Sequence, residues 1–168
     1  GLAEIVARGV GGEATGVGVV EGGTGRGGIA TARSTSGGTV SFGSAALTAN
    51  GVGGVGPIGG EGIGGAAVLD ADEAGSALTI TQDVSTSDQV ILNQNAILNA
   101  LGFGGNASAV GGNGGAGTGG AVAVTTSEGG RITLPAAPDA GNTFGAIRML
   151  AAGLGGNSFD GGQGGDGT

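Results

Sequence analysis

Glycine at every third position is the feature of this sequence that most restricts its fold. Two stretches keep such a frame: Gly53, Gly56, Gly59, Gly62 and Gly65 in the first, and Gly102, Gly105, Gly111, Gly114, Gly117 and Gly120 in the second. Glycine loses more backbone freedom on folding than any other residue, so an ordered glycine segment needs dense backbone hydrogen bonding. A three-residue period matches the polyproline-II helix, which has no internal hydrogen bonds. We therefore predict polyproline-II-like segments that pack backbone to backbone.

Glycine tracts also occur in collagen and in flexible surface loops. Collagen requires a sustained Gly-X-Y repeat with abundant proline, and this chain has 46 glycines but only 3 prolines. Collagen is therefore excluded. Flexible surface loops remain the alternative, although a loose loop has no reason to keep a three-residue frame.

The chain also repeats on a longer scale. The phrases "IVARGVGG", "LTANGVGG", "LNALGFGG" and "LAAGLGG" place Gly9, Gly51, Gly102 and Gly153 in equivalent positions. We interpret residues 1–168 as one repeat array and as a section of a longer one. Its predicted units are a partial unit 1–8, repeats 9–50, 51–101 and 102–152, and a partial unit 153–168.

Each repeat contains short alternations of small apolar residues. The first set is "IATA" from Ile29, "AAVL" from Ala66 and "AVAV" from Ala121, and the second is "GGTVSF", "GSALTI" and "GGRITL". Alternation with a period of two between turn residues indicates half-buried β-strands. The predicted fold is all-β, a repetitive β-solenoid-like stack of short strands. Variable inserts at 81–95 and 135–146 are expected to form loops on one face.

Charge and residue types exclude several function classes. Thirteen acidic residues against five arginines give a net charge of -8, which disfavours nucleic acid as a partner. No apolar run is long enough for a membrane span. Histidine, cysteine and lysine are absent, so the usual nucleophile and base pairs cannot form. We predict neither an enzyme nor a cofactor.

Calcium is the one metal for which the sequence offers candidate ligands. The phrase "GGQGGDGT" resembles the opening of the calcium-binding nonapeptide of β-roll repeats and places Asp166 at the ligand position. "DADE" brings Asp70, Asp72 and Glu73 close together as hard oxygen ligands. A solvated acidic turn is nevertheless the favoured interpretation of "DADE", and no metal site is predicted.

Phrases such as "GGNGGAGTGGAVAV" and "GGRITL" are similar to the glycine-rich strand repeats of large surface proteins of Gram-negative bacteria, such as autotransporter passengers and filamentous adhesins. The resemblance implies an extracellular or cell-surface location and a role in adhesion, biofilm or matrix. Our first hypothesis is a structural rod or self-assembling filament, built as a homopolymer or within a longer parent chain. The second is a monomeric adhesin stalk that binds a partner through inserts 81–95 and 135–146.

Overall fold

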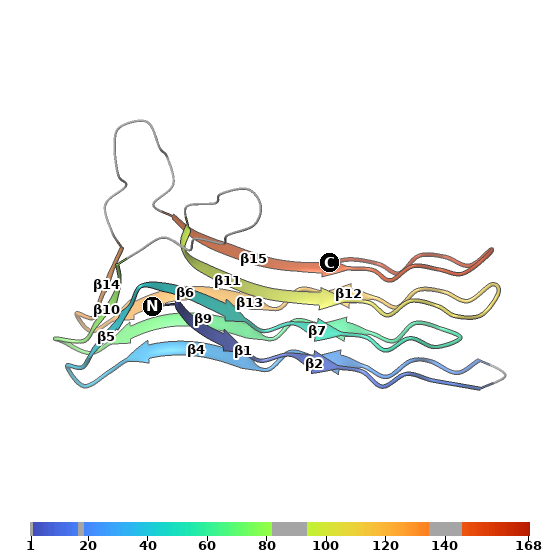
Figure 1. Ribbon diagram of the computed structural model, residues 1–168, viewed down its shortest axis with the longest axis horizontal. Coiled ribbons are helices and arrows are strands. Elements are labelled where there is room, and N and C mark those ends of the chain that lie inside the picture. The colour runs from blue at the N-terminus through green and yellow to red at the C-terminus, as the bar shows by residue number, and fades with distance from the viewer. Residues whose placement is uncertain (1, 17–18, 82–93, 135–145) are drawn as a thin grey trace, which may run out of the picture.

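The computed structural model describes residues 2–16, 19–81, 94–134 and 146–168. All regular secondary structure within these residues is β-strand, and the strands pair in parallel within four short sheets. The prediction of an all-β fold is therefore confirmed. Figure 1 shows the strands in tiers, with strands from successive parts of the chain lying one above another.

The largest sheet has six strands. They are β1 (Leu2–Val6), β2 (Gly9–Val10), β6 (Ser44–Thr48), β7 (Gly51–Val52), β11 (Gln94–Phe103) and β15 (Ala146–Leu154). The long strand β11 lies at the centre of the pairing, because it contacts β6, β7 and β15.

Three further sheets have three strands each. One consists of β4 (Ile29–Ser34), β9 (Ala66–Asp72) and β13 (Ala121–Ser127), and the next of β5 (Thr39–Phe42), β10 (Ala77–Ile80) and β14 (Arg131–Thr133). The last contains the two-residue strands β3 (Gly25–Arg26), β8 (Gly62–Ile63) and β12 (Gly117–Thr118). We call β1–β5 the first level of the molecule, β6–β10 the second, β11–β14 the third, and β15 with the residues after it the fourth.

Residues that the repeated phrases align lie opposite one another in these sheets. Gly51 pairs with both Gly9 and Gly102, and Gly102 pairs with Gly153. Ala66, the first residue of "AAVL", likewise pairs with Ile29 and Ala121. Each level therefore places the same part of its sequence over the corresponding part of the level before it.

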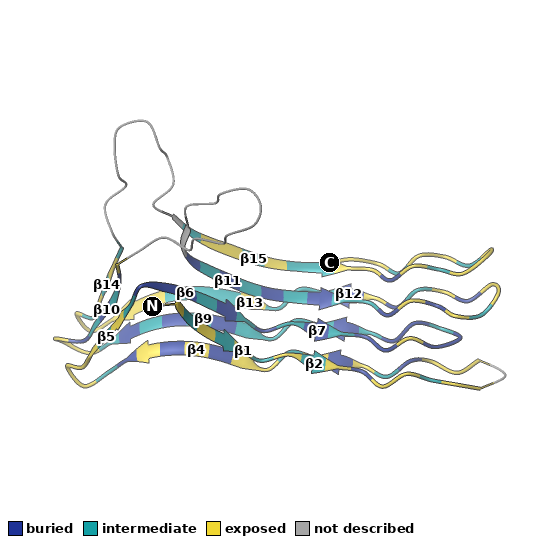
Figure 2. Ribbon diagram, viewed as in Figure 1, coloured by how far each residue is buried: buried dark blue, intermediate teal, exposed yellow. Residues whose placement is uncertain are grey.

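The core lies between the six-stranded sheet and the two sheets that contain β9 and β10. It is built mostly from alanine with a few larger side chains, and its buried members are Ala30, Ala32, Ala45, Leu47, Ala49, Ala67, Leu69, Ala71, Leu78, Ile80, Ala96 and Leu98. Alternate residues of β4 and β9 are buried, as a period of two requires. Small side chains keep the core thin, and Figure 2 shows the fourth-level strand β15 as a mixture of exposed and half-buried residues.

Tight turns follow β4, β9 and β13 in the first three levels. In the first level Ser36 and Gly37 both have positive φ, and in the third level Glu128 and Gly129 do. Two successive positive φ values define a type I′ turn, for which glycine is favoured. At the other end of β4, β9 and β13 the chain runs out into narrow glycine-rich hairpins, which extend well beyond the sheets (Figure 1).

Candidate functional site

In each level the hairpin has an outgoing segment, which leaves the six-stranded sheet, and a returning segment, which in the first three levels leads to β4, β9 or β13. Backbone hydrogen bonds join corresponding segments of successive levels. Along the outgoing segments, the Gly53 N–H donates to Phe103 O (2.8 Å) and the Gly56 N–H to Asn106 O (3.4 Å). Along the returning segments, Gly59 donates to Asn113 O and Gly114 to Gln163 O, both at 2.9 Å. Donors within one segment are three residues apart.

A second set of hydrogen bonds connects outgoing with returning segments. It forms a continuous zigzag in which each acceptor glycine is the donor of the next bond, through Gly165, Gly156, Gly115, Gly105, Gly60, Gly54, Gly23 and Gly12. Each N···O distance is 2.8 or 2.9 Å. The outgoing segments therefore form one row and the returning segments a second row, with hydrogen bonds within each row and between the two rows. This dense hydrogen bonding offsets the backbone entropy that glycine loses on folding.

Ten of the eleven predicted packing glycines lie where backbone groups approach closely. A Cβ atom at any of these ten would come within 3.0 Å of a backbone atom of another segment, which Cβ atoms do not tolerate; the ten are Gly53, Gly56, Gly59, Gly62, Gly65, Gly102, Gly105, Gly114, Gly117 and Gly120. Gly111 is the exception. A Cβ there would meet no atom within 4 Å, and glycine is favoured instead by a φ of +73° in the turn.

The three-residue frame overlooked a second set of tightly packed glycines. A Cβ at Gly54, Gly60, Gly104 or Gly115 would also come within 3.0 Å of another segment's backbone. Two of every three hairpin positions therefore face a neighbouring segment, one in the same row and one in the opposite row. The signal was present in the sequence as repeated Gly-Gly doublets, such as Gly53-Gly54 and Gly114-Gly115.

The third position of each period points outward and carries the side chains. Three asparagines bind the next level: Asn50 Oδ1 accepts from the Leu101 N–H (2.9 Å), Asn106 Oδ1 from the Asn157 N–H (2.9 Å) and Asn113 Oδ1 from the Gln163 N–H (3.0 Å). The asparagines therefore extend hydrogen bonding to groups that backbone packing does not reach.

The calcium candidates of "DADE" lie on the outward side of β9 and just after it. Arg33 of β4 bridges Asp70 and Asp72, with Nε 2.8 Å from Asp70 Oδ2 and a terminal nitrogen 2.6 Å from Asp72 Oδ2. From β13, Thr125 Oγ1 donates to Asp70 Oδ1 (2.6 Å) and Ser127 Oγ donates to Asp72. The Arg33 guanidinium group and the hydroxyl groups of Thr125 and Ser127 thus bind the two carboxylates.

These contacts change the ionisation of Asp72. The hydrogen bond from Ser127 lowers the pKa of the Asp72 carboxyl below its ordinary value, and the neighbouring Arg33 lowers it further, while partial burial acts in the opposite direction. Glu73 is exposed and has a φ of +74°, in the turn after β9. It makes no part of the Arg33 bridge.

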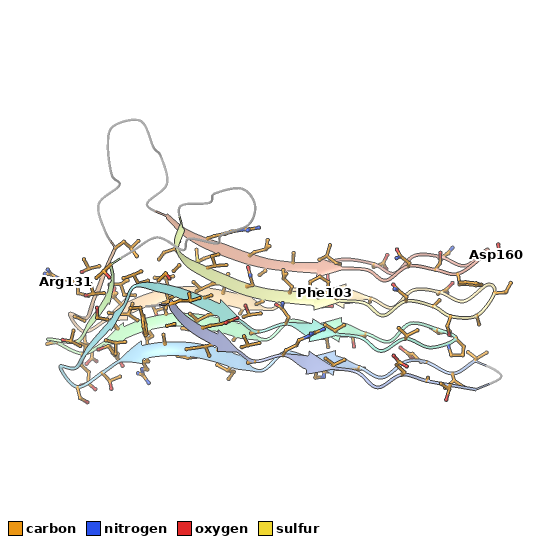
Figure 3. All side chains as sticks on the ribbon, in the orientation of Figure 1. Phe103, Arg131 and Asp160 are labelled. Carbon is orange, nitrogen blue, oxygen red and sulfur yellow. The ribbon has the colours of Figure 1, made fainter. Side chains whose placement is uncertain are left out.

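Asp166, the fourth calcium candidate, lies far from the other three in the returning segment of the fourth hairpin. Its side chain is exposed, and its backbone carbonyl accepts from the Gly117 N–H (2.8 Å). Across the described parts of the chain, no three or more His, Cys, Asp or Glu side chains gather closely enough to hold a metal ion. Figure 3 shows acidic Asp160 at the tip of the hairpins, remote from the sheets.

Inserts 81–95 and 135–146, the predicted binding loops, lie almost wholly outside the described residues. The described residues form no helix with the length and apolar character of a membrane span. No protein-family model matches this sequence, and no curated protein or solved structure matches it. A function is therefore inferred from the architecture of the sheets and hairpins.

Proposed function

We propose that this chain is a structural protein whose levels continue one another as a β-solenoid, forming a β-rich rod within a longer parent chain or a homopolymeric filament. The observation that carries the proposal is the pairing in register: strands of all four sheets pair in parallel with their counterparts in the next level. Among the described residues, strand pairing joins each level to the adjacent ones, which is the organisation of a repeat protein.

The hairpins supply the second element of the proposed rod. We infer that their segments are polyproline-II-like helices, because their row-forming N–H donors recur every three residues. Such helices gain no stability from internal hydrogen bonds, so the contacts between levels hold them in place. A hairpin of this kind stiffens a rod without requiring a large apolar core.

The proposed location is extracellular or at the cell surface, with a role in adhesion, biofilm or matrix. The resemblance of phrases such as "GGRITL" to repeats of bacterial surface proteins supports it. Apart from its carboxylates, the chain has only five arginines as charged side chains, and its net charge is -8. This composition also suits a structural rather than a catalytic role.

An adhesin stalk is the alternative function. Both inserts leave the array at the same point, after the sheet of β5, β10 and β14 and before a strand of the six-stranded sheet. Loops that leave a repeat array at one point are well placed to contact a partner.

Electron microscopy of the purified chain at micromolar concentration, without added ligand, tests the structural proposal. We expect long uniform filaments or rods with a regular axial repeat. A variant lacking residues 82–93 and 135–145 is the control, since the rod should survive their removal. Short separate particles whose binding to cell surfaces disappears with the inserts would instead support the adhesin stalk. Irregular aggregates without an axial repeat would contradict both.

A further inference from the structure

The outward side of the six-stranded sheet combines apolar residues with six polar or charged ones, which are Glu4, Arg8, Thr48, Asn50, Asn99 and Arg148. Core residues alternate with residues that face away from the core, and we call the latter the outer face; its apolar members are Val6, Val10, Val52, Ile97, Leu101, Phe103, Leu150 and Leu154. Val6, Val10 and Leu154 are 55%, 63% and 49% exposed. Val10, Val52, Phe103 and Leu154 pair in one apolar line across the four levels. An exposed apolar patch rimmed by polar residues is a typical feature of an interaction site.

The two central strands of the outer face differ in side-chain size. The second-level residues Ala46, Thr48, Asn50 and Val52 are small. Two of the paired third-level residues are clearly larger, with Ile97 opposite Ala46 and Phe103 opposite Val52. The smaller side chains leave a depression of about 560 Å³, lined by Glu4, Val6, Arg8, Thr48, Asn50, Val52 and Phe103. Phe103 stands at its edge, at the end of β11 (Figure 3).

One line of paired residues across the outer face has opposite charges at its two ends. Glu4 pairs with Ala46, Ala46 with Ile97, and Ile97 with Arg148. The line therefore runs from an acidic first-level residue, through a small and a large apolar residue, to a basic fourth-level residue. Both charged side chains are exposed.

We propose that a second copy of this chain packs on the outer face, related by a twofold axis that runs parallel to the strands between β6 and β11. Under this rotation, each residue faces a partner residue at the same position along the strand direction. The order of the levels is reversed in the partner, so the first level faces the fourth and the second faces the third. Glu4 then faces the partner's Arg148, and Arg148 faces the partner's Glu4. The same contact is made twice, as a twofold interface requires.

The rotation also matches large side chains to small ones. Ile97 faces the partner's Ala46, and Phe103 faces the partner's Val52 at the depression. Arg8 faces the partner's Ala152, whose small side chain leaves room for the guanidinium group. A twofold axis perpendicular to the strands would instead keep the order of the levels and reverse the strand direction. Glu4 would then face first-level residues and Arg148 fourth-level residues, so the opposite charges would not meet, and the large third-level side chains would face third-level residues. Charge and shape therefore select the same orientation.

The size of the contact predicts a weak dimer. Four strands about 4.8 Å apart and roughly seven residues long at about 3.3 Å each give a footprint of about 400 Å² per copy. Stable interfaces bury about 800 Å² per partner, so we expect a dissociation constant in the micromolar range or weaker. The proposed dimer is a lateral contact between two rods, so it rests on the proposed function. It is additional to the contacts between levels along the axis of each rod.

Charge reversal tests this arrangement by sedimentation equilibrium from micromolar to millimolar concentration. The mass of the wild-type particle should double over this range, whether that particle is a single chain or a rod of several chains. Glu4→Arg or Arg148→Glu alone should weaken the dimer about tenfold, because two modest attractions between exposed charges become repulsions. The double variant Glu4→Arg, Arg148→Glu should restore wild-type association, because the opposite charges return with their sides exchanged.

Arg131→Glu is the matched control, because it makes the same charge change on β14, outside the outer face (Figure 3). It should leave the dimer unchanged. A monomer at every concentration would overturn the proposal, as would a dimer that does not respond to reversal and restoration. Circular dichroism distinguishes failure of the dimer proposal from failure of the proposed rod. A monomer that keeps a β-sheet spectrum would contradict only the dimer, whereas loss of that spectrum would contradict the rod as well.

Discussion

A hairpin residue's position in the three-residue period determines how well it tolerates a side chain. Gly114 and Ala116 are two residues apart in the same returning segment, yet they face different surroundings. A Cβ at Gly114 would come within 3.0 Å of the backbone of the fourth level, whereas Ala116 already carries an exposed Cβ. Valine should therefore have very different consequences at these two positions.

We expect Gly114→Val to destabilise the protein by about 3 kcal/mol or more, because overpacking of this kind forces backbone segments apart. Ala116→Val adds the same two methyl groups beyond Cβ at an outward position and should change stability by less than about 0.5 kcal/mol. Amide hydrogen exchange measures both effects, with faster exchange at Gly105 and Gly156 expected in Gly114→Val alone. Equal exchange in the two variants would contradict backbone packing in the hairpins.

Asp72 is a carboxyl group whose ionisation depends on contacts made in the folded state. Its pKa is lowered by the Ser127 hydrogen bond first and then by Arg33, so the folded value lies below the unfolded value of about 3.9. A lowered folded pKa stabilises the ionised folded state above the unfolded pKa. That contribution is lost as the pH falls through the folded pKa.

We therefore expect Ser127→Ala to raise the pKa of Asp72 and to move the acid loss of stability to higher pH. Carbon-detected NMR titration of the side-chain carboxyl reports the pKa directly. Thr125→Ala removes a hydroxyl group from Asp70 instead and should leave the Asp72 titration in place. An Asp72 titration identical in wild type and Ser127→Ala would show that the hydroxyl group does not set its ionisation.

The strands were more predictable than the details of the hairpins. Alternating phrases such as "AAVL" locate strands because burial on one side repeats every two residues, and the repeated phrases also aligned Gly51 with Gly9 and Gly102. In the hairpins the three-residue frame identified one packed glycine per turn. It missed the second, which at Gly54, Gly60 and Gly115 faces the same row. A linear period does not reveal how many neighbours a segment has.

The acidic pair illustrates a further limit of sequence reasoning. Asp70 and Asp72 look like solvated or metal-binding groups when only "DADE" is considered. Their partner Arg33 lies in the preceding level and comes beside them only because β4 and β9 pair with Arg33 opposite Asp70. Side-chain partners between levels follow from strand register, which local composition does not contain.

The molecule as a whole depends on contacts between successive levels. Its core is thin and rich in alanine, so the few fully buried leucines carry much of the apolar burial. Leu98 pairs with Leu47 of the second level and with Met149 of the fourth, and it is fully buried. A defect at this position should therefore spread to the neighbouring levels rather than remain in one level.

We expect Leu98→Ala to lower the free energy of unfolding by about 2–5 kcal/mol, as buried leucine truncations do. Leu154→Ala is the matched control, since Leu154 is 49% exposed on the outer face and should cost less than about 1 kcal/mol in the monomer. Denaturant unfolding gives the energies, and hydrogen exchange locates them. Because coupling runs between adjacent levels, protection in Leu98→Ala should fall most in β6 and β15 and least in β1. A uniform loss of protection would instead mean that the levels unfold as one cooperative unit rather than as a nearest-neighbour array.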